Sequence, residues 1–263
     1  GDADHLDNGP DEFVQHLPAN NEKVRIATVV SRQEGETGEK GASSEGKRIK
    51  IVAHPDSPIE FETSERVEID VTGSTGDDVM IGPKHGSATF YGGAGNDRLI
   101  AKAKQANRRH AFYGEAGNDT LEGGPGRDTL DGGTGDDVIY GKRGRNHIYG
   151  GHGNDVIHDG EGASTINTGA GQNELHIADG DHDITTGPGF THITAGPGAK
   201  IIRPSYGGVT IITWHPDQRY DLSAWPTPPQ ITRTDSGHRL RCGLTILDLV
   251  GSNDEAHLAT QIA

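Results

Sequence analysis

The chain has 263 residues, which allows one or two domains. Only 31% of the residues are hydrophobic, and 40 are glycine, about twice the usual share. This composition excludes an ordinary globular core and leaves either disorder or a repeat fold with tight turns. The formal net charge of -15 argues against nucleic acid and anionic membranes as partners, and it is compatible with bound cations.

The single cysteine, Cys242, excludes an internal disulfide, and we expect it in a core rather than as a nucleophile. A secreted protein without disulfides needs another means of stabilisation, for which metal is the usual substitute. No stretch approaches the ~18 apolar residues of a membrane span. The chain starts at Gly1 without a Met or a signal-like segment, so we expect a processed form or a fragment.

The N-terminal part, residues 1–72, is predicted to combine short strands with linkers. Residues 1–22 are predicted to be weakly ordered, and residues 33–46, rich in Glu, Gly and Ser, are typical of a flexible linker. The strand-like runs are residues 23–30, 47–53, 59–62 and 67–71.

From Gly114 onward the sequence repeats with a period of nine residues. The fourth position of eleven consecutive blocks is glycine, and the eighth is always aliphatic. These aliphatic residues are Leu121, Leu130, Ile139, Ile148, Ile157, Ile166, Leu175, Ile184, Ile193, Ile202 and Ile211. Two earlier blocks begin at Gly73 and Gly92, and the stretches 82–91 and 101–113 are each interpreted as one irregular block. A register of this length excludes an irregular Gly-rich linker.

Each block predicts a six-residue turn followed by a three-residue strand whose middle side chain points inward. Two blocks then make one coil, and the coils stack as parallel strands because one coil alone buries too little surface. The sequence therefore predicts an all-β fold, a parallel β-roll or β-solenoid over residues 73–212. Short β segments should flank it, in an N-terminal part at 1–72 and a C-terminal cap at 213–263.

Four blocks match the pattern GGxGxDxUx, those that begin at Gly92, Gly123, Gly132 and Gly150. This pattern resembles the repeats-in-toxin (RTX) nonapeptide, and the resemblance covers residues 73–212. The resemblance implies that each Ca²⁺ sits between two stacked turns, held by turn carbonyls and by the sixth-position aspartates. Oxygen ligands of this kind suit calcium, and the scarcity of soft ligands disfavours zinc or copper.

Blocks n and n+2 share one side of the roll, so the sixth positions form two columns. One column contains aspartate only: Asp78, Asp97, Asp119, Asp137 and Asp155. The fourth-position glycines of the same turns are Gly76, Gly95, Gly117, Gly135 and Gly153. We predict up to four calcium sites between successive members of this column. The alternative is ordinary turn chemistry without a metal.

The other column begins with Asp128, Asn146 and Ser164, with Arg127 and Arg145 at the fifth positions. An arginine beside a site opposes a cation, so Asp128 with Asn146 is only a weaker candidate site. After Asp155 the sixth positions of both columns lose their carboxylates, and we expect this half to stack without calcium. Most of the histidines in the roll are predicted to point outward, as solvated surface: His147, His152, His158, His176, His182 and His192.

Residues 213–223 are similar to the segment that closes the roll in serralysin-like proteins. Strands are predicted at 230–234, 238–241 and 244–250, with a hairpin turn at Asp235-Ser236-Gly237. The segment should cover the open edge of the solenoid. Residues 251–263 are either a C-terminal signal of type I secretion or a plain tail.

No HExxH or GxSxG motif occurs, so we expect no catalysis by a metalloprotease or lipase site, and an enzyme is the less favoured interpretation. The favoured function is a calcium-binding module of a secreted bacterial protein. It would fold on calcium after export by a secretion apparatus, and would serve as a scaffold for a toxin, exoenzyme or virulence effector.

Two other functions stay open. One is an extracellular adhesion protein that uses the roll surface to bind a host protein or glycan, which a binding patch on the roll would support. The other is an effector or carbohydrate-active enzyme with an unrecognised N-terminal site, which a pocket with converging carboxylates would support.

Overall fold

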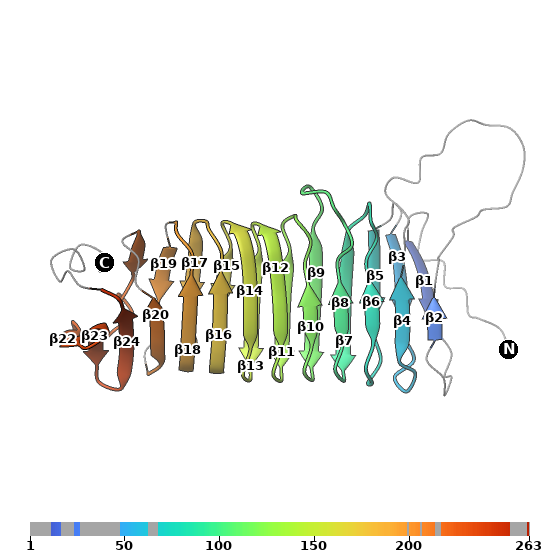
Figure 1. The fold of residues 1–263 in the computed structure, drawn as a ribbon. Helices are drawn as coiled ribbons and strands as arrows, with labels where there is room; N and C mark the ends of the chain where they lie inside the picture. Colours follow the sequence, from blue (N-terminus) through green and yellow to red (C-terminus); the bar gives the residue numbers. More distant parts are fainter. Residues whose placement is uncertain are drawn as a thin grey trace, which may run out of the picture.

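The computed structural model consists of two long β-sheets that face each other along an extended solenoid (Figure 1). The residues that it describes are 12–16, 24–26, 48–62, 68–198, 200–205, 207–213, 217–252 and 262. The described residues contain no helix, and every pairing along the stack is parallel until the C-terminal hairpin. The predicted all-β parallel solenoid is thus confirmed.

The odd-numbered strands up to β21 form one sheet of eleven strands, here called sheet A. Its strands are β1 Glu12–His16, β3 Arg48–Val52, β5 Glu68–Thr72, β7 Ala88–Ala94, β9 His110–Ala116, β11 Thr129–Thr134, β13 His147–His152, β15 Thr165–Asn167, β17 His182–Thr185, β19 Lys200–Arg203 and β21 Gln218–Tyr220.

The even-numbered strands and the C-terminal hairpin form the second sheet of thirteen strands, sheet B. Its strands are β2 Val24–Ile26, β4 Ile59–Glu62, β6 Val79–Ile81, β8 Arg98–Ile100, β10 Thr120–Glu122, β12 Val138–Gly144, β14 Val156–Gly162, β16 Gly171–Ile177, β18 Gly189–Ala195, β20 Val209–Thr213, β22 Gln230–Thr234, β23 Gly237–Cys242 and β24 Thr245–Val250.

The core is two columns of fully buried side chains, one from the middle of each three-residue strand. Sheet A contributes Phe90, Phe112, Leu130, Ile148, Ile166, Ile184, Ile202 and Tyr220. Sheet B contributes Met80, Leu99, Leu121, Ile139, Ile157, Leu175, Ile193 and Ile212. The two stretches without a motif each make one block, as predicted, because Phe90 and Phe112 take the inward position there and stack at 4.9 Å.

The last aliphatic position was predicted one residue too early. Ile211 is only half-buried, whereas Ile212 pairs with Ile193 and is fully buried. Ile193 and Ile212 are nineteen positions apart instead of eighteen, so one residue has been added between β19 and β20. The added residue lies in a stretch that contains Gly207, which adopts a φ of 87°.

The N-terminal strands stack in the same two sheets. The runs predicted within residues 23–30, 47–53, 59–62 and 67–71 contain β2, β3, β4 and β5. Residues 12–16 were wrongly predicted to be weakly ordered, because β1 pairs in parallel with β3 over its whole length. Residues 1–11, 33–46 and Val67 lie outside the described part of the chain.

Both sheets continue across residues 72 and 212, and the three-part division of the chain at these points stays a prediction. No helix in the described residues is long and apolar enough to cross a membrane.

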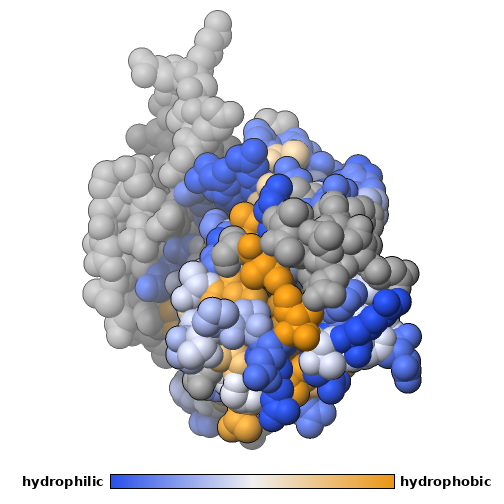
Figure 2. Space-filling model, turned by 90° about the vertical axis from the view of Figure 1, so that its left-hand side faces the viewer, coloured by the Kyte–Doolittle hydropathy of each residue, from blue (hydrophilic) through white to orange (hydrophobic). Residues whose placement is uncertain are grey.

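The C-terminal strands close the solenoid. β24 pairs in parallel with β20, and β23 and β22 follow as an antiparallel extension, which confirms the predicted strands and hairpin. The Trp225 indole Nε1 donates to the Pro204 carbonyl at 3.1 Å, and Cys242 is buried. An apolar band crosses the surface of this end (Figure 2). The likeness to serralysin caps stays a prediction, and residues 214–216 and 253–261 lie outside the described residues.

Replacing a core aliphatic by a charge tests the two-column core. We expect Ile148→Asp to destabilise the fold by about 4 kcal/mol or more, with or without calcium, because it buries an unpaired carboxylate. Thermal unfolding followed by far-UV circular dichroism measures this. The control is Tyr149→Asp on the neighbouring side chain, which is 41% exposed, and a similar loss in both variants would contradict the assigned register.

A candidate calcium site along one edge of the solenoid

The turns that lead from sheet A to sheet B line one edge, here called the acidic edge. They span residues 73–78, 92–97, 114–119, 132–137 and 150–155. Their sixth residues lie in one column and are buried: Asp78, Asp97, Asp119, Asp137 and Asp155. The turns from sheet B back to sheet A line the opposite edge, whose sixth positions include Asp128, Asn146, Ser164, His182 and Lys200.

One oxygen of each aspartate holds neighbouring coils together. The Asp97 amide donates to Asp119 Oδ1 at 2.7 Å, and the Asp119 amide donates to Asp137 Oδ1 at 2.7 Å. The same bond joins Asp137 to Asp155 at 3.0 Å and Asp78 to Asp97 at 2.8 Å. The ladder therefore uses Oδ1 and leaves Oδ2 for another partner.

The second oxygen has no hydrogen-bond donor in four of these turns. The Oδ2 atoms of Asp97, Asp119, Asp137 and Asp155 are buried and unpartnered within the described residues. A Cβ placed on Gly114 would collide with both Asp119 Oδ2 and the Gly132 carbonyl oxygen, so these two acceptors face the same small space. Two buried acceptors that converge without a donor favour either a cation between them or protonation of the carboxylate.

The backbone conformation explains why Oδ2 is bare in these turns. In the turn 132–137, Gly133 and Gly135 have φ values of 104° and 126°. Positive φ at the second and fourth positions recurs in the turns that end at Asp97, Asp119 and Asp155, where Glu115 adopts 74° despite its side chain. We call these four the open turns.

The turns that end at Asp78 and Asp128 are different. Asp78 Oδ2 accepts from the Ser74 amide at 2.6 Å, and Asp128 Oδ2 accepts from the Gly124 amide at 2.8 Å. Gly76 and Gly126, at their fourth positions, do not have positive φ. These carboxylates are already satisfied, so they fit a cation less well than the four open turns, a distinction that the sequence motif does not show.

The electrostatics of the open turns also favour a cation. Burial, together with neighbouring carboxylates, raises the pKa of Asp97 and of Asp137 to about 7. Burial raises the pKa of Asp119 and of Asp155 to about 6. A bound divalent cation would reverse this penalty because it favours the charged form of each carboxylate.

The donor set fits calcium better than a softer metal. No cluster of three or more His, Cys, Asp or Glu side chains with metal-binding geometry occurs in the described residues. A site between two turns has one carboxylate from each and must take its other ligands from carbonyls. Calcium accepts six to eight oxygens of this mixed kind.

Turns without an open carboxylate supply their own donor. Asn173 Nδ2 donates to the Gly169 carbonyl at 3.2 Å, and Asn146 Nδ2 donates to the Gly141 carbonyl at 3.0 Å. On the opposite edge the buried Lys200 Nζ donates to Pro197 at 2.8 Å and to the Gly180 and Gly198 carbonyls at 3.3 Å. Lys200 thus places a covalently attached cation among the turn carbonyls, and residue type alone gave no sign of this.

His182 is the exception to the prediction that most of the histidines point outward. It is buried on the opposite edge, with Nδ1 3.5 Å from Asp159 Oδ2. Burial lowers the pKa of His182 to about 4 and raises the pKa of Asp159, so both favour their neutral forms. The other histidines of the predicted group are exposed or half-buried, and His158 stacks between Tyr140 and His176 on the outer face of sheet B.

Comparison with known protein families adds the decisive observation. The RTX calcium-binding nonapeptide repeat matches in four copies, at residues 86–103, 113–148 and 149–181. The chain is an RTX calcium-binding repeat protein. Its cofactor is therefore calcium, as predicted. The matched segments include all four open turns and exclude Asp78. A comparison with curated proteins found no match.

The raised carboxyl pKa values predict an unusual pH dependence without calcium. A carboxyl whose pKa is higher in the folded state stabilises the fold when protonated, and this contribution is lost as pH rises through 6–7. In chelator we expect a higher melting temperature at about pH 5.5 than at about pH 8, and with calcium the reverse. The low pKa values of His110 and His182 oppose this trend, but four carboxyls outweigh them. A lower melting temperature at acid pH in both buffers would contradict it.

Removing the ammonium group tests the role of Lys200. We expect Lys200→Met to destabilise the fold by about 2 kcal/mol at any calcium concentration, because three partly buried carbonyls lose a charged donor. Denaturant unfolding measures the change, with the exposed Arg219→Met of the adjoining coil as the control. If calcium restored the stability that Lys200→Met loses, the Lys200 ammonium group would not be needed to satisfy the carbonyls of its turn.

Proposed function

We propose that this chain is the calcium-responsive module of a protein that works outside the bacterial cell, where it serves as a scaffold for a toxin, exoenzyme or effector. A secretion apparatus would export it unfolded. The observation that carries the proposal is the row of four buried Oδ2 atoms without donors at Asp97, Asp119, Asp137 and Asp155. RTX repeats are typical of secreted proteins, which supports the location.

The proposed ligands differ in rank. Asp97, Asp119, Asp137 and Asp155 are the main carboxylate ligands, and Asp78 and Asp128 are weaker ones because their turns already supply a donor. The glycines Gly76, Gly95, Gly117, Gly135 and Gly153 would shape the turns that carry the carbonyl ligands. Three sites between successive open turns are therefore the strongest.

The switch follows from linkage between binding and folding. Without calcium, the stacked carboxylates are desolvated and repel one another, which favours the unfolded chain that export requires. Extracellular calcium modules bind at about 10⁻⁴–10⁻³ M, a concentration that the cytosol does not reach. Calcium that binds only the folded coils adds its binding free energy to their stability.

A calcium titration followed by far-UV circular dichroism, with magnesium as control, tests the proposal. We expect a cooperative gain of β signal that is specific to calcium. If the β signal were complete in chelator and insensitive to calcium, the aspartates would be turn residues and the switch would be absent.

Variants at one open turn sharpen the test. Asp137→Ala should raise the calcium midpoint by about tenfold or more, since Asp137 lies between two sites. Asp137→Asn should weaken calcium binding equally but stabilise the calcium-free fold, because its amide can donate to turn carbonyls as Asn173 does. Asn146→Ala on the opposite edge should raise the calcium midpoint far less. Equal effects of Asp137→Ala and Asn146→Ala would contradict the column assignment.

A further inference from the structure

Between residues 73 and 155, the charged residues of the turns are sorted between the two edges of the solenoid. The five turns of the acidic edge contain eight carboxylates and neither Lys nor Arg. The opposite edge, over residues 82–87, 101–109, 123–128 and 141–146, contains nine Lys and Arg and a single carboxylate, the buried Asp128. The next turns of the opposite edge, 159–164 and 177–182, carry Asp159, Glu161, Asp179 and Asp181 instead. The chain's net charge of -15 conceals this concentration of positive charge.

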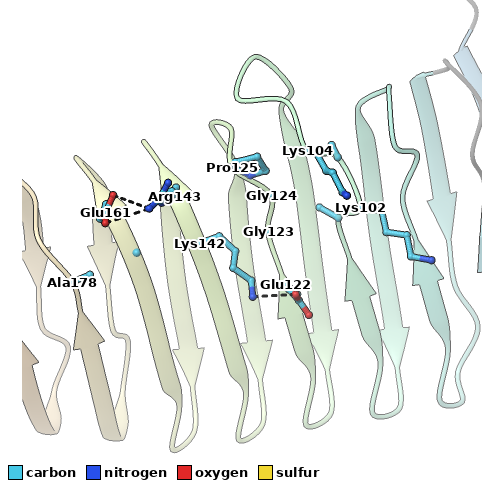
Figure 3. A pocket seen from close by; sticks show the side chains of 13 residues that line it. Lys102, Lys104, Glu122, Gly123, Gly124, Pro125, Lys142, Arg143, Glu161 and Ala178 are labelled. Carbon is cyan, nitrogen blue, oxygen red and sulfur yellow. Dashed lines mark hydrogen bonds and ion pairs between the residues drawn. The ribbon is translucent and has the colours of Figure 1, made fainter.

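Six exposed cations on this edge form a row that we call the basic ridge. Its members are Lys102, Lys104, Arg127, Lys142, Arg143 and Arg145. Four of its members, Lys102, Lys104, Lys142 and Arg143, line an open groove of about 580 Å³ (Figure 3) that crosses the turns of successive coils from Ala101 to Ala178. Arg127 and Arg145 lie outside this lining and occupy the same position of successive turns, whose strands lie about 4.8 Å apart.

Internal ion pairs account for only half of the ridge. Lys102 pairs with Glu62, Lys142 with Glu122 at 3.1 Å, and Arg143 with Glu161 at 3.3 Å. These pairs lie at partly exposed positions, where they contribute little to stability. Among the described residues, Lys104, Arg127 and Arg145 have no ion-pair partner. Their charge is therefore available to a ligand.

We propose that the basic ridge and its groove bind an acidic polysaccharide, a linear chain with carboxylate or sulfate groups as well as hydroxyls. The unpaired cations match the acidic groups, and the carboxylates of Glu122 and Glu161 in the same groove can accept bonds from hydroxyls. A nucleic acid fits less well, since no aromatic side chain lines the groove to stack on a base.

Binding to dextrans that differ only in their substituents tests the proposal. The probes are carboxymethyl-dextran, dextran sulfate and unmodified dextran, measured by calorimetry with saturating calcium on protein whose fold is verified by circular dichroism in the same buffer. We expect one or both acidic polymers to bind and unmodified dextran not to bind. Folded protein that binds neither acidic polymer would overturn the proposal, and would leave the calcium switch untouched.

Two sets of variants locate the site. Lys104→Gln/Arg127→Gln/Arg145→Gln should weaken binding about tenfold. The matched control, Arg219→Gln/Arg233→Gln/Arg241→Gln, removes the same charge from exposed positions near the C-terminal end and should stay within about twofold of the parent. Equal losses would mean non-specific attraction and would overturn the assignment of the ridge.

A single-stranded DNA oligonucleotide separates a glycan from a nucleic acid. We expect the parent protein to bind it more weakly than at least one acidic dextran, because no aromatic side chain lines the groove to stack on a base. DNA binding that is tighter than the binding of both acidic dextrans by the parent protein would assign the ridge to nucleic acid instead.

Discussion

Carbonyl groups crowd the turns at both edges of the solenoid, because each coil repeats the same turn about 4.8 Å above the last. A stack of buried acceptors is tolerated only where a donor or a cation lies among them. The chain meets this requirement in three ways. Asn146 and Asn173 donate from a side-chain amide, Lys200 inserts its own ammonium group, and the open turns present carboxylates that need an external cation. The residue at the sixth position of a turn thus determines whether calcium, a side-chain amide or an ammonium group satisfies the carbonyls of that turn.

Because the groups at the sixth positions change along the chain, the two halves of the solenoid differ in whether they need calcium. The open turns end at Asp155, and the next turn on that edge ends at Asn173, whose Oδ1 accepts from the Asp155 amide at 2.9 Å. From there to β24 no turn among the described residues ends in an open aspartate, and Lys200 and the buried Thr186–Thr210 contact satisfy groups in the turns. The buried His182 ring and Asp159 Oδ2, 3.5 Å apart, are the exception, since neither makes a hydrogen bond within the described part of the chain. In a solenoid each coil interacts mainly with its neighbours, so a stable segment can template the next coil. The C-terminal coils are therefore the natural template on which calcium adds the coils from 92 to 155.

The period of nine was sufficient to predict the two sheets, both core columns and the aspartate column, because each depends on spacing within the chain. It could not predict β1, whose pairing with β3 is a tertiary contact. It placed the last core residue at Ile211 because one added residue shifts the register without disturbing the motif. Nor could it separate Asp78 and Asp128 from the open turns, since that difference lies in the φ angles at the second and fourth positions. The sequence also did not show that the side chains of Lys200 and His182 point inward, because residue type does not reveal the direction of a side chain.

The same alternation that segregates the charges also couples the two proposed sites. Turns of the basic ridge lie between open turns in the sequence: Arg127 separates Asp119 from Asp137, and Arg145 separates Asp137 from Asp155. The ridge exists as a row only when these coils are stacked, and their stacking is what calcium stabilises. A ligand that binds the assembled ridge must then lower the calcium concentration needed for folding, and calcium must raise the affinity for the ligand by the same factor. A polyanion bound directly at the open turns would instead compete with the carboxylates for calcium and shift the midpoint upward, so the direction of that shift identifies the edge at which the ligand binds.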